Sequence, residues 1–166
     1  MENGIDGRGG PLPPEPWLYS ERIIDAMAAA AQIHARHKRK ATEIPYLGHR
    51  LGTCSIALEF GATEDEAMAA LLHDSIEDGQ PTSAHRATVW SFGSEVGRIV
   101  EGCTDADTHP KPPWRERKEA YLASLATKDH SVLLVSASDK WFALGILVSI
   151  KARANHFAEA RGCRLT

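Results

Sequence analysis

The chain has 166 residues, 43% of them hydrophobic and 25% charged, with a formal net charge of −3. This length suffices for one domain with a buried core, and the weak negative charge argues against a surface for nucleic acid or membrane. Apolar runs stay below the roughly 18 residues of a membrane span. The three cysteines form no CxxC pair, which argues against a thiolate zinc site and a disulfide framework. We therefore expect a single cytoplasmic domain over residues 19–166.

The first third of the chain predicts a tail followed by two helices. Residues 1–18 are rich in glycine and proline, which predicts a flexible N-terminal tail. Ser20 is a candidate cap for a helix over 20–38. The segment RKATEIPYLGH then forms a loop, because Pro45 disfavours helical geometry at the residue before it. A second helix is expected over 48–60, where a glycine follows.

The rest of the chain predicts further helices. Thr63 caps a helix that carries EAMAALLHDSIED and ends near Gly79. Three more helices are expected over 81–90, 94–102 and 114–125, with the proline-rich loop THPKPPWRER before the last of them. The apolar stretch SVLLVSASDKWFALGILVSI suits a buried strand or a buried helix, and its length favours the helix. The fold class is therefore all-α, a bundle of six to eight helices.

The stretch AALLHDSIEDG at 69–79 places four metal-capable side chains inside an apolar run. Taking His73 as zero on a helix, Glu77 lies at about 40° and Asp74 at about 100°. Asp78 follows at about 140°, so all four share one side. Carboxylates that lie close together repel one another unless they share a proton or a cation, and a divalent metal meets that need. The alternative is a solvated acidic helix end.

Two further residues strengthen the interpretation as a metal site. His49 follows the turn IPYLG at the start of a predicted helix. Asp139 lies in the middle of an apolar helix, where an unpaired charge costs several kcal/mol and an ionised carboxylate needs a partner. Two histidines and two aspartates suit manganese, iron or zinc better than calcium.

Four sequence motifs in order resemble one family. They are RKATEIPYLGH at 39–49, ALLHDSIED at 70–78, FGSEVGRIVEGCTD at 92–105 and LLVSASDK at 133–140. They resemble the HD-domain metal-dependent phosphohydrolases, and most closely the hydrolase domain of the RelA/SpoT alarmone enzymes and its small stand-alone relatives. The resemblance covers residues 20–142 and implies an all-helical HD bundle.

The resemblance also implies a reaction and its residues. The family removes the 3′-pyrophosphate from guanosine tetra- or pentaphosphate. The implied ligands of one divalent metal, usually Mn²⁺ with Fe²⁺, Zn²⁺ or Mg²⁺ as alternatives, are His49, His73, Asp74 and Asp139. The acidic pair that matches Glu77 and Asp78 handles the nucleophilic water.

The substrate implied is a small-molecule nucleotide, with no nucleic-acid or membrane partner, and homo-oligomerisation is left open. In the family, the arginine that matches Arg39 lies at the guanine base. Tyr46 comes from the same loop and is a candidate pocket residue. Lys40 and Lys140 are candidate cations for the phosphates.

The last motif departs from the family pattern. The family usually continues it as D-K/R-L-H-N, whereas this chain reads DKWFALG, with Phe142 and Ala143 in place of the histidine and asparagine. This departure keeps two alternatives open: an HD-type nucleotidase or phosphodiesterase, and a catalytically weakened nucleotide-binding regulator. His34 and His37, in HARHKRK, are interpreted as a solvated basic helix end.

Overall fold

The computed structural model describes residues 19–40, 42–78, 82–108 and 110–160, without the side chains of residues 78, 82 and 146–160. Every secondary-structure element within these residues is an α-helix or a 3₁₀ turn, apart from one isolated β-bridge between Lys38 and Pro45. The elements are α1 (Arg22–Ile33), α2 (Leu47–Glu59), α3 (Glu64–Leu72), α4 (Ser75–Asp78), α5 (Thr82–Ser91), α6 (Ser94–Cys103), α7 (Trp114–Ser124), the 3₁₀ turn η1 (Leu125–Thr127) and α8 (His130–Ala160). The predicted all-α class is confirmed, and the tail predicted over 1–18 lies outside the described residues.

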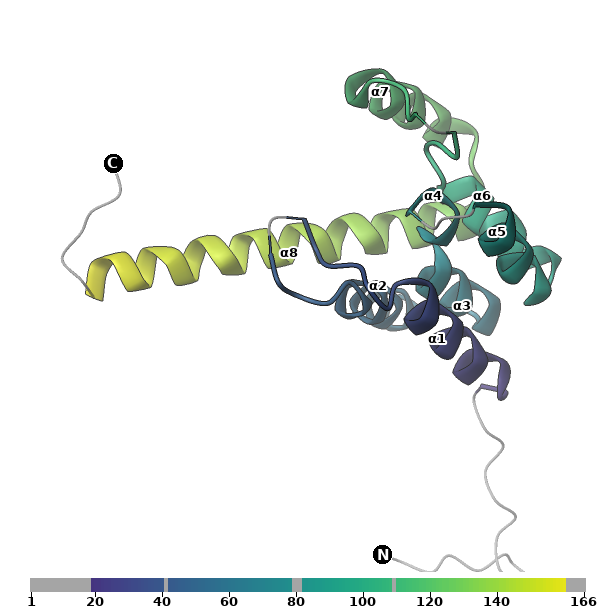
Figure 1. The fold of residues 1–166 in the computed structure, drawn as a ribbon, viewed down its shortest axis with the longest axis horizontal. Coiled ribbons are helices and arrows are strands. Elements are labelled where there is room, and N and C mark those ends of the chain that lie inside the picture. Colours follow the sequence, from purple (N-terminus) through teal and green to yellow (C-terminus); the bar gives the residue numbers. More distant parts are fainter. Residues whose placement is uncertain (1–18, 41, 79–81, 109, 161–166) are drawn as a thin grey trace, which may run out of the picture.

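Helix α3 is the centre of the bundle. It packs against α1, α2, α6 and α8, and its residues from Ala67 to Leu72 are fully buried. Figure 1 shows α1, α2 and α3 on one side of α8, with α5 and α6 near its N-terminal end and α7 above them. A helix with apolar residues on all sides is stable only when it is surrounded, which explains the central place of this short segment. No helix among the described residues is long and apolar enough to cross a membrane.

Local signals set several helix ends as predicted. Thr63 and Glu66 form a capping box at the start of α3, in which the Thr63 hydroxyl accepts from the backbone N–H of Glu66. Gly61 follows α2 with a φ of 82°, a left-handed conformation that glycine adopts without strain. These signals act over a few residues, and this is why they can be read from the sequence.

Two predicted helices are shorter in the structure. The helix expected over 20–38 ends at Ile33, and the chain turns so that the backbone N–H of Tyr46 donates to the carbonyl of His37. The helix expected from Thr63 to near Gly79 is broken: α3 ends at Leu72, a turn follows, and α4 begins at Ser75. His73 nevertheless keeps helical backbone angles, and His73, Asp74 and Glu77 line one pocket, in agreement with the common side predicted for them.

Close contact between α2 and α8 depends on one glycine. A Cβ atom added at Gly52 would lie 2.0 Å from Cε2 of Phe142. The ring of Phe142 therefore packs directly on the backbone of α2. It also lies 5.6 Å from the His49 ring, centroid to centroid. This contact fixes the spacing between the two helices that carry His49 and Asp139.

Candidate metal centre and active-site pocket

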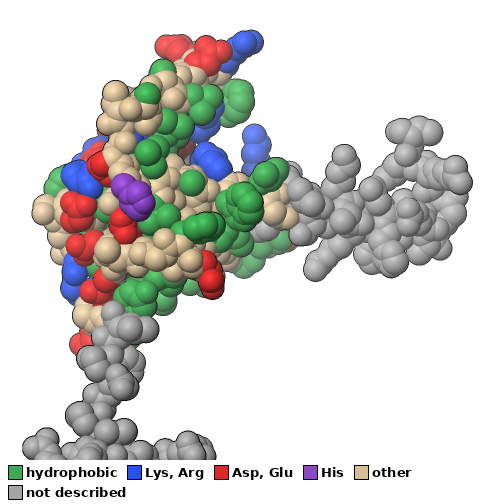
Figure 2. Space-filling view, turned by 180° about the vertical axis from the view of Figure 1, so that it is seen from behind, with side chains coloured by type: hydrophobic (Ala, Val, Ile, Leu, Met, Phe, Trp, Pro, Cys, Tyr) green, Lys and Arg blue, Asp and Glu red, His purple; other side chains and the backbone are tan. Residues whose placement is uncertain are grey.

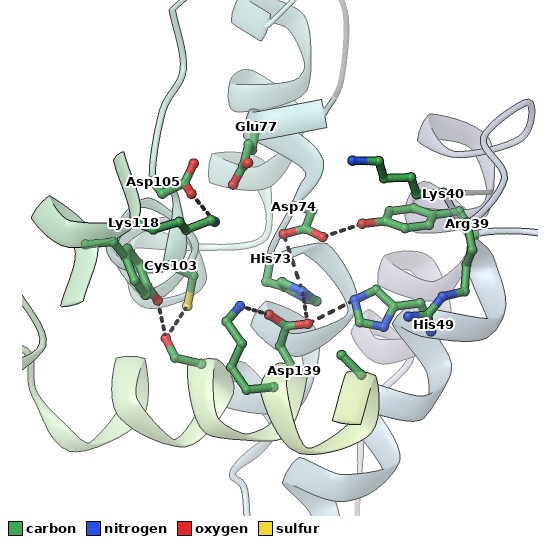
Figure 3. A pocket seen from close by; sticks show the side chains of 15 residues that line it. Arg39, Lys40, His49, His73, Asp74, Glu77, Cys103, Asp105, Lys118 and Asp139 are labelled. Atoms are coloured by element: carbon green, nitrogen blue, oxygen red, sulfur yellow. Dashed lines mark hydrogen bonds and ion pairs between the residues drawn. The ribbon is translucent and has the colours of Figure 1, made fainter. Parts of the chain in front are cut away.

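The four residues predicted as metal ligands come together from separate parts of the bundle. His49 projects from α2, His73 and Asp74 occupy the turn between α3 and α4, and Asp139 projects from α8 (Figure 3). Nε2 of His49 lies 3.0 Å from Oδ1 of Asp139. Nε2 of His73 lies 3.4 Å from Oδ1 of Asp74 and 3.7 Å from Oδ1 of Asp139. Ligand atoms of His49, His73 and Asp74 all lie within 4.8 Å of one another, close enough to share one cation, and Asp139 adjoins them through the two histidines.

Burial and charge give His49, Asp74 and Asp139 the protonation states that metal ligands need. Burial by itself raises the pKa of Asp139, but hydrogen bonds from His49 and His73 outweigh it and hold that pKa well below its ordinary value. Burial also raises the pKa of Asp74, but the charge of Arg50 and other nearby groups outweighs burial, so this pKa is lowered too. Burial lowers the pKa of His49, so its imidazole is neutral. Ionised carboxylates and neutral imidazoles are the forms that bind metal.

A backbone contact orients His73. Its Nδ1 lies 2.8 Å from the carbonyl oxygen of Ala70. Because a carbonyl can only accept, Nδ1 donates to it, and this contact turns Nε2 toward Asp74 and Asp139. Such an outer contact is the usual device for fixing a histidine ligand. The residues present therefore fit one hard or borderline divalent cation.

The sequence did not identify Arg50, the charged residue that pairs with Asp74. Arg50 is fully buried, and its Nη2 donates to Oδ2 of Asp74. The hydroxyl of Tyr46 donates to the same oxygen at 2.8 Å. Arg50, Cys54 and Ala57 are all buried on α2 at helical spacing. A charged residue on an otherwise apolar stripe was the signal that could have identified it.

Glu77 lies beside this cluster in a carboxylate-rich corner of the pocket (Figure 3). Burial, followed by the charges of Asp74 and Asp105, raises the pKa of Glu77 to about 7. Nζ of Lys111 lies 3.2 Å from its Oε1, and Nη1 of Arg117 lies 3.6 Å away. The side chain of Asp78 lies outside the described residues.

Asp105 is a second pocket residue that sequence reasoning missed. Its side chain is only 2% exposed, and it pairs with Arg117 at 2.5 Å and with Lys118. Arg115 of α7 pairs within its own helix, with its Nε 2.8 Å from Oε1 of Glu119. Arg117 and Lys118 instead reach across from α7 to Asp105.

A cavity of about 290 Å³ opens beside the ligand cluster. Its lining includes all four predicted substrate residues, Arg39, Lys40, Tyr46 and Lys140. The amine of Lys118 lines it as well. In the view from behind, basic side chains lie in the hollow between α7 and α8 (Figure 2). The pocket therefore combines a carboxylate–imidazole cluster with several cations, which suits an anionic substrate.

The two residues that depart from the family's final motif lie in different surroundings. Ala143 lines the pocket, as expected for a residue in the place of the family's asparagine. Phe142 instead packs on Gly52, and the guanidinium carbon of Arg39 lies 5.9 Å from the centre of its ring. Phe142 thus spaces α2 from α8 and also borders Arg39.

The interpretation of His34 as part of a solvated helix end is wrong. His34 is 2% exposed, and its Nδ1 lies 3.0 Å from Nδ1 of His37. Burial, followed by the charge of Arg50, lowers the pKa of His34 to about 3. Its imidazole is therefore neutral and belongs to the core that supports the site.

Known proteins are similar to this chain in sequence and in fold. An HD-domain family model matches residues 26–160. The chain is 36% identical over 125 residues to the guanosine-3′,5′-bis(diphosphate) 3′-pyrophosphohydrolase MESH1 of Xenopus tropicalis, spanning 74% of this chain and 67% of that protein. Its identity to the enzyme of that name in Homo sapiens is 34% over 126 residues, spanning 74% and 68% of the two chains.

A solved structure is similar as well. It is described as a metazoan orthologue of SpoT that hydrolyses ppGpp, and it superposes with a TM-score of 0.70 at 29% identity. The match covers 78% of this chain and 72% of that one. The chain belongs to the HD-domain family and, within it, to the RelA/SpoT-type hydrolases.

Proposed function

We propose that the chain is a metal-dependent pyrophosphohydrolase that removes the 3′-pyrophosphate from guanosine tetra- or pentaphosphate. The observation that carries the proposal is the convergence of two histidines and two aspartates in a pocket that also holds a buried glutamate and several cations. The activity named for the relatives of this chain supports the choice of substrate.

His49, His73, Asp74 and Asp139 would hold one divalent cation. Mn²⁺ is our first choice because imidazole with carboxylate suits it, with Fe²⁺, Zn²⁺ and Mg²⁺ as alternatives. Such a cation, when bound, lowers the pKa of water and offsets negative charge on a phosphoryl group. The ionised state of both aspartates and the neutral state of His49 support this assignment.

Glu77 is proposed as the residue that accepts a proton from the attacking water. A general base works best when its pKa lies near the operating pH, and burial brings the pKa of Glu77 to about 7. Lys111 and Arg117 contact its carboxylate and restrict its position. Asp78 is proposed as its partner in handling the water.

The cations of the pocket are proposed to bind the substrate's phosphates. Lys40 and Lys140 line the cavity, and Lys118 enters it from α7. Asp139 outweighs the effect of burial and raises the pKa of Lys140, so this amine is charged. Arg39 and Tyr46 are proposed to lie along the nucleoside, since both border the cavity.

A direct assay tests the proposal. Metal-free protein is loaded with Mn²⁺ and supplied with guanosine tetraphosphate, and release of pyrophosphate and guanosine diphosphate is measured. Glu77→Gln should lower the rate by about 10²-fold or more while nucleotide affinity is kept, as expected for loss of a general base. Glu119→Gln is a matched control on the exposed face of α7. Folded, Mn²⁺-loaded protein that releases no pyrophosphate would overturn the proposal.

A second candidate rests on Ala143. This methyl group lines the pocket where the family's asparagine offers an amide, so a nucleotidase, a phosphodiesterase or a nucleotide-binding regulator is the alternative. The first two would release orthophosphate from nucleoside monophosphates or open cyclic nucleotides. A regulator would bind guanosine tetraphosphate without any turnover that Glu77→Gln could reduce.

A further inference from the structure

Arg50 is an unusual residue to find beside a metal centre. It follows His49 on α2, and it is 0% exposed. Guanidinium remains protonated under all ordinary conditions, so this is a permanent positive charge inside the bundle. A buried charge is tolerated only when it is paired, and the pairing of Arg50 therefore decides what it does.

The contacts of Arg50 are directed at two of the proposed metal ligands. Its Nη2 donates to Oδ2 of Asp74, and its Nη1 lies 2.9 Å from Nδ1 and 3.0 Å from Nε2 of His73. Because Nη1 is almost equidistant from the two ring nitrogens, the guanidinium faces the imidazole as a whole. Arg50 therefore places a fixed positive charge against both residues, where it opposes the approach of a divalent cation.

Both aspartates of the cluster already form ion pairs with basic side chains of the protein. Arg50 pairs with Asp74, and Lys140 pairs with Asp139. Their mobility differs, because the Lys140 side chain is 65% exposed whereas that of Arg50 is fully buried. Lys140 has room to move into solvent when a cation arrives. Arg50 is also held over the ring of Tyr46, with its guanidinium carbon 4.5 Å from the ring centre.

We propose that Arg50 is a resident cation of the metal centre, which neutralises the buried site when metal is absent and competes with the divalent ion for His73 and Asp74. The inference rests on the proposed metal centre but not on the proposed substrate. It has two consequences of opposite sign. Removing the charge destabilises the metal-free protein, and it tightens metal binding, because like charges in a low-dielectric site repel.

The test separates the charge of Arg50 from its hydrogen bonds. Arg50→Gln removes the charge and keeps an amide donor, whereas Arg50→Lys keeps the charge. Arg98→Gln is the control, since Arg98 pairs with Glu95 and Asp129 away from the pocket. All proteins are prepared with Mn²⁺, stripped with chelator and titrated with Mn²⁺. Free ion is followed by its electron paramagnetic resonance signal, and thermal unfolding is recorded with and without metal.

The proposal gives a definite order of results. Arg50→Gln should bind Mn²⁺ at least about tenfold more tightly than the parent protein, while Arg50→Lys and the control stay close to it. Without metal, Arg50→Gln should have a lower melting temperature than Arg50→Lys. Saturating Mn²⁺ should reduce the difference between the two melting temperatures.

Three results would overturn the proposal. One is unchanged or weaker Mn²⁺ binding by Arg50→Gln, which would make Arg50 a positioning residue only. Another is equal tightening in Arg50→Lys, because the charge would then not be the cause. The third is failure of Arg50→Gln to fold even with excess Mn²⁺, since a bound metal should replace the missing charge. None of these measurements uses a nucleotide, so loss of the proposed activity would leave them informative.

Discussion

Replacement of Gly52 by alanine tests how far the metal centre depends on the contact between α2 and α8. The added Cβ would lie 2.0 Å from Cε2 of Phe142, whereas ordinary van der Waals contacts begin at 3.4 Å. The ring or the whole of α8 must therefore retreat by about 1.4 Å, the difference between the two distances. Because α8 also carries Asp139, this movement would reach the ligand cluster.

The expected magnitude follows from two opposing effects. Overpacking of this kind costs about 1–3 kcal/mol of unfolding free energy. Alanine is favoured over glycine inside a helix by about 1 kcal/mol, which offsets part of that loss. Gly48→Ala is the matched control on the same helix, because a Cβ there meets nothing within 4 Å. The difference in stability between the two variants, about 1–3 kcal/mol, isolates the clash.

Metal affinity should follow the same order. Nε2 of His49 and Oδ1 of Asp139 lie 3.0 Å apart. A retreat of α8 separates these atoms, and Mn²⁺ binding to Gly52→Ala should weaken about 10-fold to 100-fold, the range seen when supporting contacts of metal ligands are lost.

Urea unfolding and Mn²⁺ titration of single and double variants measure both effects. Adding Phe142→Ala to Gly52→Ala should recover part of the loss, so that the two substitutions are non-additive by about 0.5–3 kcal/mol. The reasoning is refuted if Gly52→Ala matches Gly48→Ala in both stability and Mn²⁺ affinity.

Glu77, His34 and Thr63 give three further expected outcomes. Burial, then Asp74, raises the pKa of Glu77 to about 7, so the hydrolysis rate should rise through that pH as its carboxylate ionises; a pH–rate profile unchanged in Glu77→Gln would contradict this role. Burial lowers the pKa of His34 from 6.5 to about 3. As pH falls, the unfolded chain therefore binds a proton at this residue before the folded protein does. The free energy of unfolding should be about 2 kcal/mol lower at about pH 5 than at neutral pH. Urea titrations of His34→Gln should show a smaller decrease. Thr63→Ala removes a capping box with Glu66 and should cost about 1 kcal/mol in the same assay, whereas Thr63→Ser should stay close to the parent.

The metal centre shows what sequence patterns can predict. The helical segments were expected from apolar spacing, and the ligand types from histidine and aspartate in apolar surroundings. Asp139 was identifiable because a charge inside an apolar helix needs a partner. The resemblance in four motifs then grouped residues that lie far apart in the sequence. The residues that contact these ligands could not be predicted from the sequence. Hydrophobic periodicity shows which face of a helix is buried, but it does not show which residues pack against that face.

The chain's own sequence determined its helical class, the cap at Thr63, the end of α2 at Gly61 and the residue types of the site, because these depend on neighbours a few positions away. Only the tertiary structure decided that the helix breaks at His73 and Asp74, that Arg50 is buried against them, and that Asp105 draws Arg117 across the pocket. These outcomes depend on buried charges finding partners. A charge acquires its partner only when separate helices pack and exclude water.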